Sequence, residues 1–403
     1  MSERPCDDPK LFTWRNGVFA AWLAVVMLAI AQHGLLGDEF GLWAFTKPVR
    51  LFLDTRDVEI YFRSSAWVVG GGTLYREVPS EYPVAANLVF GAVRGLSALL
   101  GPTRDAQTDF ALFWALGGLG ALVAAAAVAR RHGTAGFWWA WLLPAGAYFS
   151  AFRFDVYPAL ACVVAFAYLR RDRFDAAAMA LGVCIALKGY ALVAVPALLF
   201  YVYSRRGLAA AAKCCALGAL PSAVTALGAL PFCGLDGLLS AFRFHAQRSL
   251  NGESTWDALH LGAAVAAVPA LPALVAAAAG LGAAAMRPRT LERLVDACLV
   301  AVAGFTLGSV FYSPQFSLWL LALACFSERR ATLGLAYALC VASYLHFPVG
   351  YDLDRLWHGA LAPVVVLVTL LRLALVAVAA GPQFESPLSA KPERGSGGEA
   401  RPV

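Results

Sequence analysis

Residues 156–206 read VYPALACVVAFAYLRRDRFDAAAMALGVCIALKGYALVAVPALLFYVYSRR. Apolar blocks in this segment alternate with short groups of Arg, and two of the blocks meet at Lys188. Lipid-facing β-strands would need apolar and polar residues in strict alternation, which these blocks lack. A helix satisfies its own backbone hydrogen bonds in lipid. The segment therefore predicts helices that cross a membrane.

The rest of the chain repeats this pattern. Of its 403 residues, 60% are hydrophobic and 14% are charged, whereas a soluble domain carries about a quarter charged residues. Each crossing takes roughly 20 apolar residues, so we expect an all-α polytopic membrane protein with about 12 transmembrane helices. Residues 1–380 should form one transmembrane domain. Residues 381–403, rich in Gly, Ser, Pro and charge, should form a disordered tail.

Clusters of basic residues orient the chain, because loops rich in Lys and Arg stay in the cytoplasm. Five clusters recur: Arg130-Arg131, Arg170-Arg171-Arg173, Arg205-Arg206, Arg287-Arg289-Arg293 and Arg329-Arg330. They are separated by apolar blocks and form no single basic stripe, so the net charge of +6 does not indicate nucleic acid as a partner. We expect an inner-membrane protein with both termini in the cytoplasm and the intervening loops on the outer face.

The apolar block 83–101 would invert this order if it crossed the membrane. Arg94 lies in its middle, and a charge at the bilayer centre costs at least about 3 kcal/mol. We therefore predict that 83–101 stays on the outer face, inside a long first extracytoplasmic loop of residues 37–108. Charged and aromatic residues are dense in this loop, which is typical of loops that carry function.

An amphipathic helix is predicted in this loop from Asp57 onward. The apolar side chains of Val58, Tyr61, Phe62, Ala66 and Val69 fall on one helical face, and Glu59, Arg63 and Ser64 lie opposite. Such a helix can lie in the plane of the membrane surface. The Gly70-Gly71-Gly72 run should end it.

Several short motifs follow one another along the chain. They are Asp57-Val58-Glu59-Ile60-Tyr61, Gly72-Thr73-Leu74-Tyr75-Arg76, Glu81-Tyr82-Pro83, Arg153-Phe154-Asp155-Val156-Tyr157-Pro158, Lys188-Gly189-Tyr190, Phe244-His245 with Arg248, and Ser313-Pro314-Gln315-Phe316 with Trp319. In order and spacing they resemble the bacterial polyprenyl-phosphate-sugar-dependent glycosyltransferases of family 87, in the GT-C superfamily. The chain departs from the family pattern at Val84 and Ala191, where the family usually has proline.

The resemblance implies a GT-C-like bundle that transfers a sugar with inversion on the outer face of the membrane. The donor would be a polyprenyl-phosphate-linked sugar, with mannose as the expected sugar, and the acceptor a hydroxyl of a glycolipid or glycan. An acceptor hydroxyl needs a general base, and the family's outer-loop aspartate falls on Asp57. An Asp in the first turn of a helix is also a common partner of the helix dipole.

The leaving phosphate needs cationic donors. Lys188 stands alone between apolar blocks and is expected to bind the phosphate with His245 and Arg248. Snorkelling to the headgroups is the alternative for Lys188, and a salt bridge with Glu253 or Asp257 is the alternative for Arg248.

Further residues are expected on the acceptor and sugar side: Glu59, Tyr61, Glu81, Tyr82, Arg153, Asp155, Gln315 and His346. Arg153 and Asp155 could instead pair with each other or with the outer loop, and Gln315 could cap a helix. We expect no metal and no other cofactor, because no carboxylate pair and no spacing of His residues forms a convincing site.

The alternatives are two other classes of membrane protein. A secondary transporter should show internal repeats and ionisable residues near the bilayer midplane; no repeat is visible, and the charges fall at predicted helix ends. A lipid-linked glycan flippase or polymerase is the other class. The polymerases tend to carry their large outer loop late in the chain, whereas here it comes early.

Overall fold

The computed structural model of the chain describes residues 56–101, 105–134 and 138–381. These ranges are all-α, and the one β-bridge within them joins Leu74 to Val78. The α-helices are α3 (Arg56–Ser64), α4 (Val84–Leu100), α5 (Ala106–His132), α6 (Pro144–Phe152), α7 (Val156–Leu169), α8 (Phe174–Leu187), α9 (Val195–Arg206), α10 (Leu208–Ala246), α11 (Thr255–Ala258), α12 (Gly262–Ala267), α13 (Leu271–Ala285), α14 (Leu291–Gly308), α15 (Ser317–Ala324), α16 (Arg330–Tyr344), α17 (Tyr351–Leu356) and α18 (Ala362–Ala380). Short 3₁₀ helices are η2 (Ala66–Val68), η3 (Trp138–Leu142), η4 (Gly189–Ala194) and η5 (Pro314–Phe316), and η6 (Leu345–Gly350) is a π-helix.

The prediction of an all-helical membrane protein is confirmed. Within the described ranges, four helical segments are long and apolar enough to cross a membrane: Ala106–His132, Leu208–Ala246, Arg330–Asp354 and Ala362–Ala380. The pair α6 and α7 passes the same test together but is bent by 114°. Further apolar helices, such as α8 and α13, are shorter. The total of about 12 crossings stays a prediction, and residues 37–55 and 382–403 lie outside the described residues.

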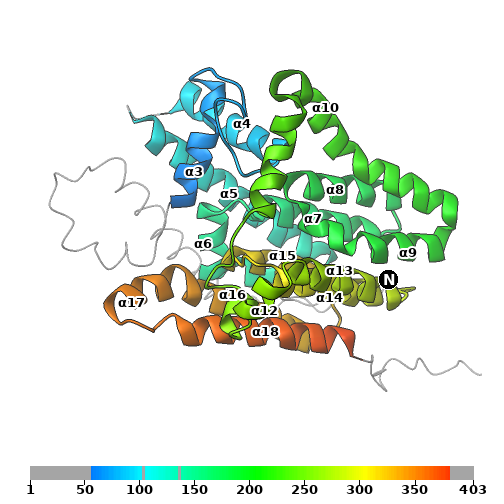
Figure 1. Cartoon of the computed structure of the whole chain (residues 1–403). Coiled ribbons are helices and arrows are strands. Elements are labelled where there is room, and N and C mark those ends of the chain that lie inside the picture. The colour runs from blue at the N-terminus through cyan, green and yellow to red at the C-terminus, as the bar shows by residue number, and fades with distance from the viewer. Residues whose placement is uncertain (1–55, 102–104, 135–137, 382–403) are drawn as a thin grey trace, which may run out of the picture.

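The helices form one packed bundle (Figure 1), and small residues lie at several of the contacts between them. α5 packs against α6 and α7, and α8 packs against α10. A Cβ atom added at Gly118 in α5 would lie 1.9 Å from the backbone oxygen of Ser150 in α6. One added at Gly182 in α8 would lie 2.3 Å from the backbone oxygen of Gly218 in α10. Small side chains at such positions let neighbouring backbones approach, which is how membrane helices usually associate.

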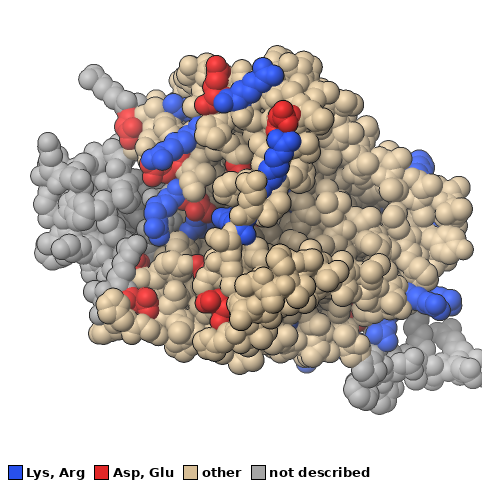
Figure 2. All heavy atoms as spheres, viewed as in Figure 1, with Lys and Arg blue, Asp and Glu red and all other residues tan. Residues whose placement is uncertain are grey.

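Contacts join the basic clusters in two groups. They link Arg170 to the His132 carbonyl, Arg205 to Asp172, Arg329 to Asp296, and both Arg293 and Arg329 to the Gly381 carbonyl. Figure 2 shows most charged side chains at the upper left and centre of the view and a few basic ones at the right, with a broad uncharged surface between them. On which side of a membrane the clusters lie stays a prediction.

The predicted amphipathic helix is shorter than expected. It ends at Ser64, and η2 follows before Gly70. Its faces are as predicted at Val58 and Tyr61, which are buried, and at Arg63, which is exposed. Ser64, expected on the polar face, is buried, and Val69, expected on the apolar face, is exposed. The apolar face packs against α4 and α5 of the protein itself, so α3 is a docked element of the bundle.

Helix α4, which covers the apolar block 83–101, packs beside α3 (Figure 1). Gly91 lies against Trp67 of η2. The Arg94 guanidinium lies 4.0 Å from the centroid of the Phe62 ring and donates to the backbone oxygen of Ala106, the first residue of α5. These contacts tie α4 to the start of α5. The basic cluster Arg130-Arg131 lies at the other end of α5.

The expectation that charges fall at helix ends is wrong for one residue. Arg372 does not lie at a helix end but in the middle of α18, where it is fully buried. It donates to the Thr306 backbone oxygen and to the Thr369 hydroxyl, and its guanidinium lies 3.9 Å from the centroid of the Tyr312 ring. No carboxylate within the described ranges pairs with it.

Candidate functional site

The residues singled out by the motifs lie where helices break. Arg153 and Asp155 occupy the bend between α6 and α7. Lys188 separates α8 from η4 and has an extended backbone, with φ −159° and ψ 117°. Gln315 and His346 lie in the short segments η5 and η6. A break interrupts the regular helical surface, so its side chains can turn towards a shared space.

Asp57 and Arg153 form an ion pair across 96 positions of sequence, counted as 153 minus 57. The Arg153 side chain is 4% exposed and that of Asp57 is 25% exposed. The Arg153 guanidinium also lies 4.5 Å from the centroid of the Phe347 ring. The Asp57 carboxylate is therefore held in place by a buried cation while part of it stays open.

Tyr61 fixes α3 over this bend. It is fully buried, and its hydroxyl accepts a hydrogen bond of 3.1 Å from the backbone N–H of Phe154. A side chain with no exposed surface cannot meet a sugar, so the predicted role of Tyr61 in sugar binding is replaced by a structural one. Because Tyr61 lies one helical turn after Asp57, this hydrogen bond also positions the Asp57 carboxylate.

Lys188 is not the isolated cation that the sequence suggested. Its Nζ donates to both carboxylate oxygens of Asp155, at 2.9 and 3.0 Å. It also lies 5.1 Å from the centroid of the Phe316 ring and 5.3 Å from that of Trp319. Asp155 is fully buried, so it acts as the counter-ion of Lys188 and is closed to a sugar, against the prediction. The Lys188 side chain keeps 20% of its surface exposed.

Glu81 and Arg248 form a second, looser pair at 3.9 Å. Nε2 of His245 lies 3.1 Å from the Glu81 backbone oxygen. Burial raises the pKa of the Glu81 carboxyl, and both Arg248 and Lys188 oppose this rise. Both predicted phosphate-binding cations thus act on one carboxylate, which places Lys188, His245 and Arg248 around Glu81.

The structure adds Glu253, which the sequence analysis considered only as a salt-bridge partner of Arg248. Its Oε2 lies 3.6 Å from Nε2 of the fully buried His346, and its side chain is 14% exposed. Burial raises the pKa of Glu253 to about 7, although Arg153 and Arg248 both act to lower it. Its sequence signal was weak, since a carboxylate in a polar loop is usually a solvated charge.

Asn251 holds this loop in place. Its backbone N–H donates to the Val310 carbonyl, and its side-chain amide both donates to the Tyr312 carbonyl and accepts from the Tyr312 N–H. Glu253 is therefore presented to the site by a fixed backbone and is not a freely moving loop charge.

The remaining predicted residues differ in access. Tyr82 is 8% exposed, and the Lys188 Nζ lies 5.9 Å from the centroid of its ring. Gln315 is 5% exposed, and its side-chain oxygen accepts from the Ser313 hydroxyl. Glu59 pairs with Arg63 on its own helix. The structure therefore brings Tyr82 to the charged cluster, whereas the carboxylate of Glu59 is engaged on the surface of α3.

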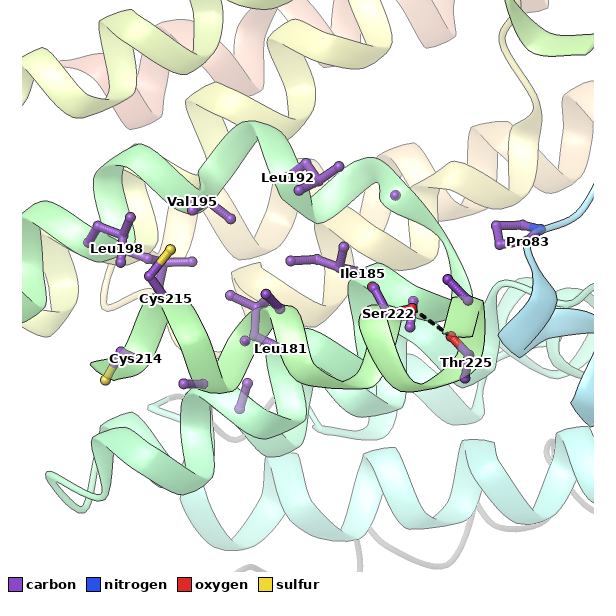
Figure 3. Close-up of a pocket in the computed structure, with 18 of the residues that line it drawn as sticks. Pro83, Leu181, Ile185, Leu192, Val195, Leu198, Cys214, Cys215, Ser222 and Thr225 are labelled. Atoms are coloured by element: carbon purple, nitrogen blue, oxygen red, sulfur yellow. Dashed lines mark hydrogen bonds between the residues drawn. The ribbon is translucent and has the colours of Figure 1, made fainter. Parts of the chain in front are cut away.

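An apolar cavity of about 600 Å³ lies among α7, α8, α9 and α10. Figure 3 shows Pro83 at one end, Leu198 and Cys214 at the other, and Leu181, Ile185 and Leu192 between them. Pro83 and Gly189 both line it, and they directly follow Tyr82 and Lys188 in the chain. The cavity therefore begins beside the charged cluster.

The site thus combines four carboxyl groups with three cations: Asp57, Glu81, Asp155 and Glu253 with Arg153, Lys188 and Arg248. No group of three or more His, Cys, Asp or Glu residues arranged to hold a metal occurs within the described ranges. Comparison with known proteins found no matching family model, no matching curated protein and no matching solved structure.

Proposed function

We propose that this protein is an integral-membrane glycosyltransferase that uses a polyprenyl-phosphate-linked sugar as its donor. The observation that carries the proposal is the junction between the apolar cavity and the charged cluster, at Pro83 and Gly189. A ligand that fills both parts has a long apolar chain and an anionic head. A lipid phosphate has this form, and the motif order predicts the same class of donor.

The donor's lipid chain would occupy the cavity, and its phosphate would meet Lys188, Arg248 and His245. Each methylene group removed from water contributes about 0.8 kcal/mol, so the chain can supply most of the affinity. The cations would stabilise the negative charge that develops on the phosphate as the bond from the sugar to the phosphate oxygen breaks.

Asp57 remains the proposed general base. A carboxylate can accept a proton, and a quarter of the Asp57 side chain is exposed beside Arg153. The hydroxyl oxygen of the acceptor would bond to the sugar carbon from the face opposite to the phosphate, which inverts that carbon. The hydroxyl proton would pass to Asp57, and polyprenyl phosphate would leave.

The proposed setting is the outer face of the inner membrane, with both termini in the cytoplasm and mannose as the expected sugar. The contacts that join the basic clusters support this orientation. The charged cluster would then open to the outside, where a glycolipid or glycan acceptor is found.

A secondary transporter is the second candidate, and buried Arg372 in the middle of α18 favours it. Ionisable groups inside membrane helices often mark transport pathways. However, the Arg372 guanidinium is engaged by two backbone oxygens and a hydroxyl. A fixed structural role therefore accounts for it.

The direct test is to incubate the purified protein with an acceptor mixture and a panel of polyprenyl-phosphate sugars, and to follow release of polyprenyl phosphate. Asp57→Asn should lower turnover by about 10²- to 10⁴-fold while donor affinity hardly changes. Glu59→Gln, on the same helix with the same loss of charge, is the matched control.

Two outcomes would separate the alternatives. Donor binding without turnover by the native chain would indicate a non-catalytic subunit that has kept the fold. If no polyprenyl-phosphate compound binds at all, the proposal is refuted.

A further inference from the structure

The Lys188 ammonium lies 5.9 Å from the ring centroid of Tyr82, and Arg248 pairs with the carboxylate of the preceding residue, Glu81. Oε2 of Glu81 is 3.9 Å from the Arg248 guanidinium, and the charge of Lys188 also acts on it. It precedes Tyr82 and Pro83, and Pro83 lines the mouth of the apolar cavity. A phosphate at the end of a lipid in that cavity would therefore enter the surroundings that Glu81 now occupies.

The fixed charges around this position are nearly balanced. Lys188 is already neutralised by the buried carboxylate of Asp155. Arg248 faces Glu81, and the negative charge of Asp57 also reaches Glu81. The site therefore holds little net positive charge for an incoming anion, unlike a site built to hold a phosphate as tightly as it can.

The donor and the product of the proposed reaction differ in charge at this point. The donor is a phosphodiester with one negative charge. The product, a lipid phosphate monoester, takes a second negative charge, because the second pKa of such a phosphate is near 6. A carboxylate beside the phosphate repels the doubly charged product more than the singly charged donor.

We propose that Glu81 is a specificity residue that lets the site bind a singly charged phosphodiester and reject the doubly charged monoester, so that the lipid phosphate product leaves. This inference rests on the proposed use of a lipid-phosphate donor. Glu81 is assigned no step in the chemistry of transfer. Its loop position is fixed independently of its charge, because the Tyr75 hydroxyl and the Asn87 side chain both donate to the backbone oxygen of the next residue, Tyr82.

The test compares two probes that differ in charge and little else: polyprenyl phosphate and its methyl ester, which carries one charge and no sugar. The affinity of each is measured for the native protein and for Glu81→Gln in lipid nanodiscs at pH 8. Glu81→Gln should tighten binding of polyprenyl phosphate by about tenfold or more, and binding of the methyl ester by much less. Glu81→Asp keeps the charge and should resemble the native protein.

Three results would overturn the inference. If both probes gain affinity equally, Glu81 only fills space; if neither affinity changes, Glu81 does not lie at the phosphate. If Glu81→Gln weakens both probes while its thermal unfolding matches that of the native protein, Glu81 helps to hold the ligand instead of repelling it. Failure of both probes to bind the native protein would refute the proposed donor class itself, whereas the first three results leave it standing.

Discussion

Replacing Glu253 with Gln should stabilise the folded protein, and increasingly so as the pH rises. Burial raises the pKa of Glu253 from 4.5 to about 7. The folded state thus binds this proton more tightly than the unfolded state, so stability is fully present below pH 4.5 and is lost as the pH rises to about 7. A shift of this size corresponds to about 3 kcal/mol at 1.36 kcal/mol per unit. Gln keeps the size and the hydrogen bonding of the neutral acid. Because Gln does not ionise, the variant should not lose this stability as the pH rises.

The measurement is thermal unfolding of the purified protein in nanodiscs between pH 4 and pH 8.5. The native protein and Glu253→Gln should unfold at similar temperatures at the acid end and should diverge above neutral pH, with the variant more stable. Glu59→Gln, whose side chain is 39% exposed, should show no such divergence. If Glu253→Gln is instead less stable at high pH, Arg153 and Arg248 keep Glu253 ionised, and the reasoning from burial is refuted.

Three further predictions follow from contacts in the bundle. Lys188→Met should weaken donor binding and also cost about 3 kcal/mol of stability, because it leaves Asp155 buried without its partner; adding Asp155→Asn should restore the unfolding temperature but not the donor affinity. If affinity survives in both variants, Lys188 does not bind the phosphate. Ile185→Trp should fill part of the cavity and weaken binding of long-chain polyprenyl phosphate more than of a short-chain analogue, and equal effects on the two lipids would place the chain elsewhere. Gly118→Ala should destabilise the protein by about 1–3 kcal/mol, because the added Cβ meets a backbone oxygen of α6. A Cβ added at Gly120 has no atom within 4 Å, so Gly120→Ala should be neutral in the same unfolding assay.

The fold class could be predicted because it follows from local properties of the sequence. Apolar blocks of sufficient length must be helices in lipid. Two of the basic clusters also lie next to each other, since Arg170 donates to the His132 carbonyl. The breaks at Arg153 and Lys188 were also visible, since each polar residue interrupts an apolar run.

The pairings inside the site could not be predicted, because they depend on distances between helices. Lys188 appeared to be alone in the sequence, yet its partner Asp155 lies 33 residues earlier, in the bend of 114° between α6 and α7. The pKa of Glu253 depends on burial by segments remote in sequence. The burial of Arg372 also depends on a neighbouring helix. A helix as apolar as α18 tolerates a single charge when another helix supplies a hydrogen-bond acceptor, here the Thr306 backbone oxygen.

The cavity extends beside most of α8, from Phe174 to Ala186. At 1.5 Å per residue, this helix of 14 residues is about 21 Å long, so a lipid chain in the cavity would be held over most of one bilayer leaflet or more. The lipid chain is the same in the donor and in the polyprenyl phosphate product. Contacts between this lipid chain and the cavity therefore strengthen binding of the product as much as binding of the donor. Uniform binding of this kind lowers the concentration of donor needed without speeding the reaction. A longer or more tightly held lipid chain would make the proposed enzyme better at capturing scarce donor and slower to exchange it. Turnover would then be limited by the dissociation of the spent lipid.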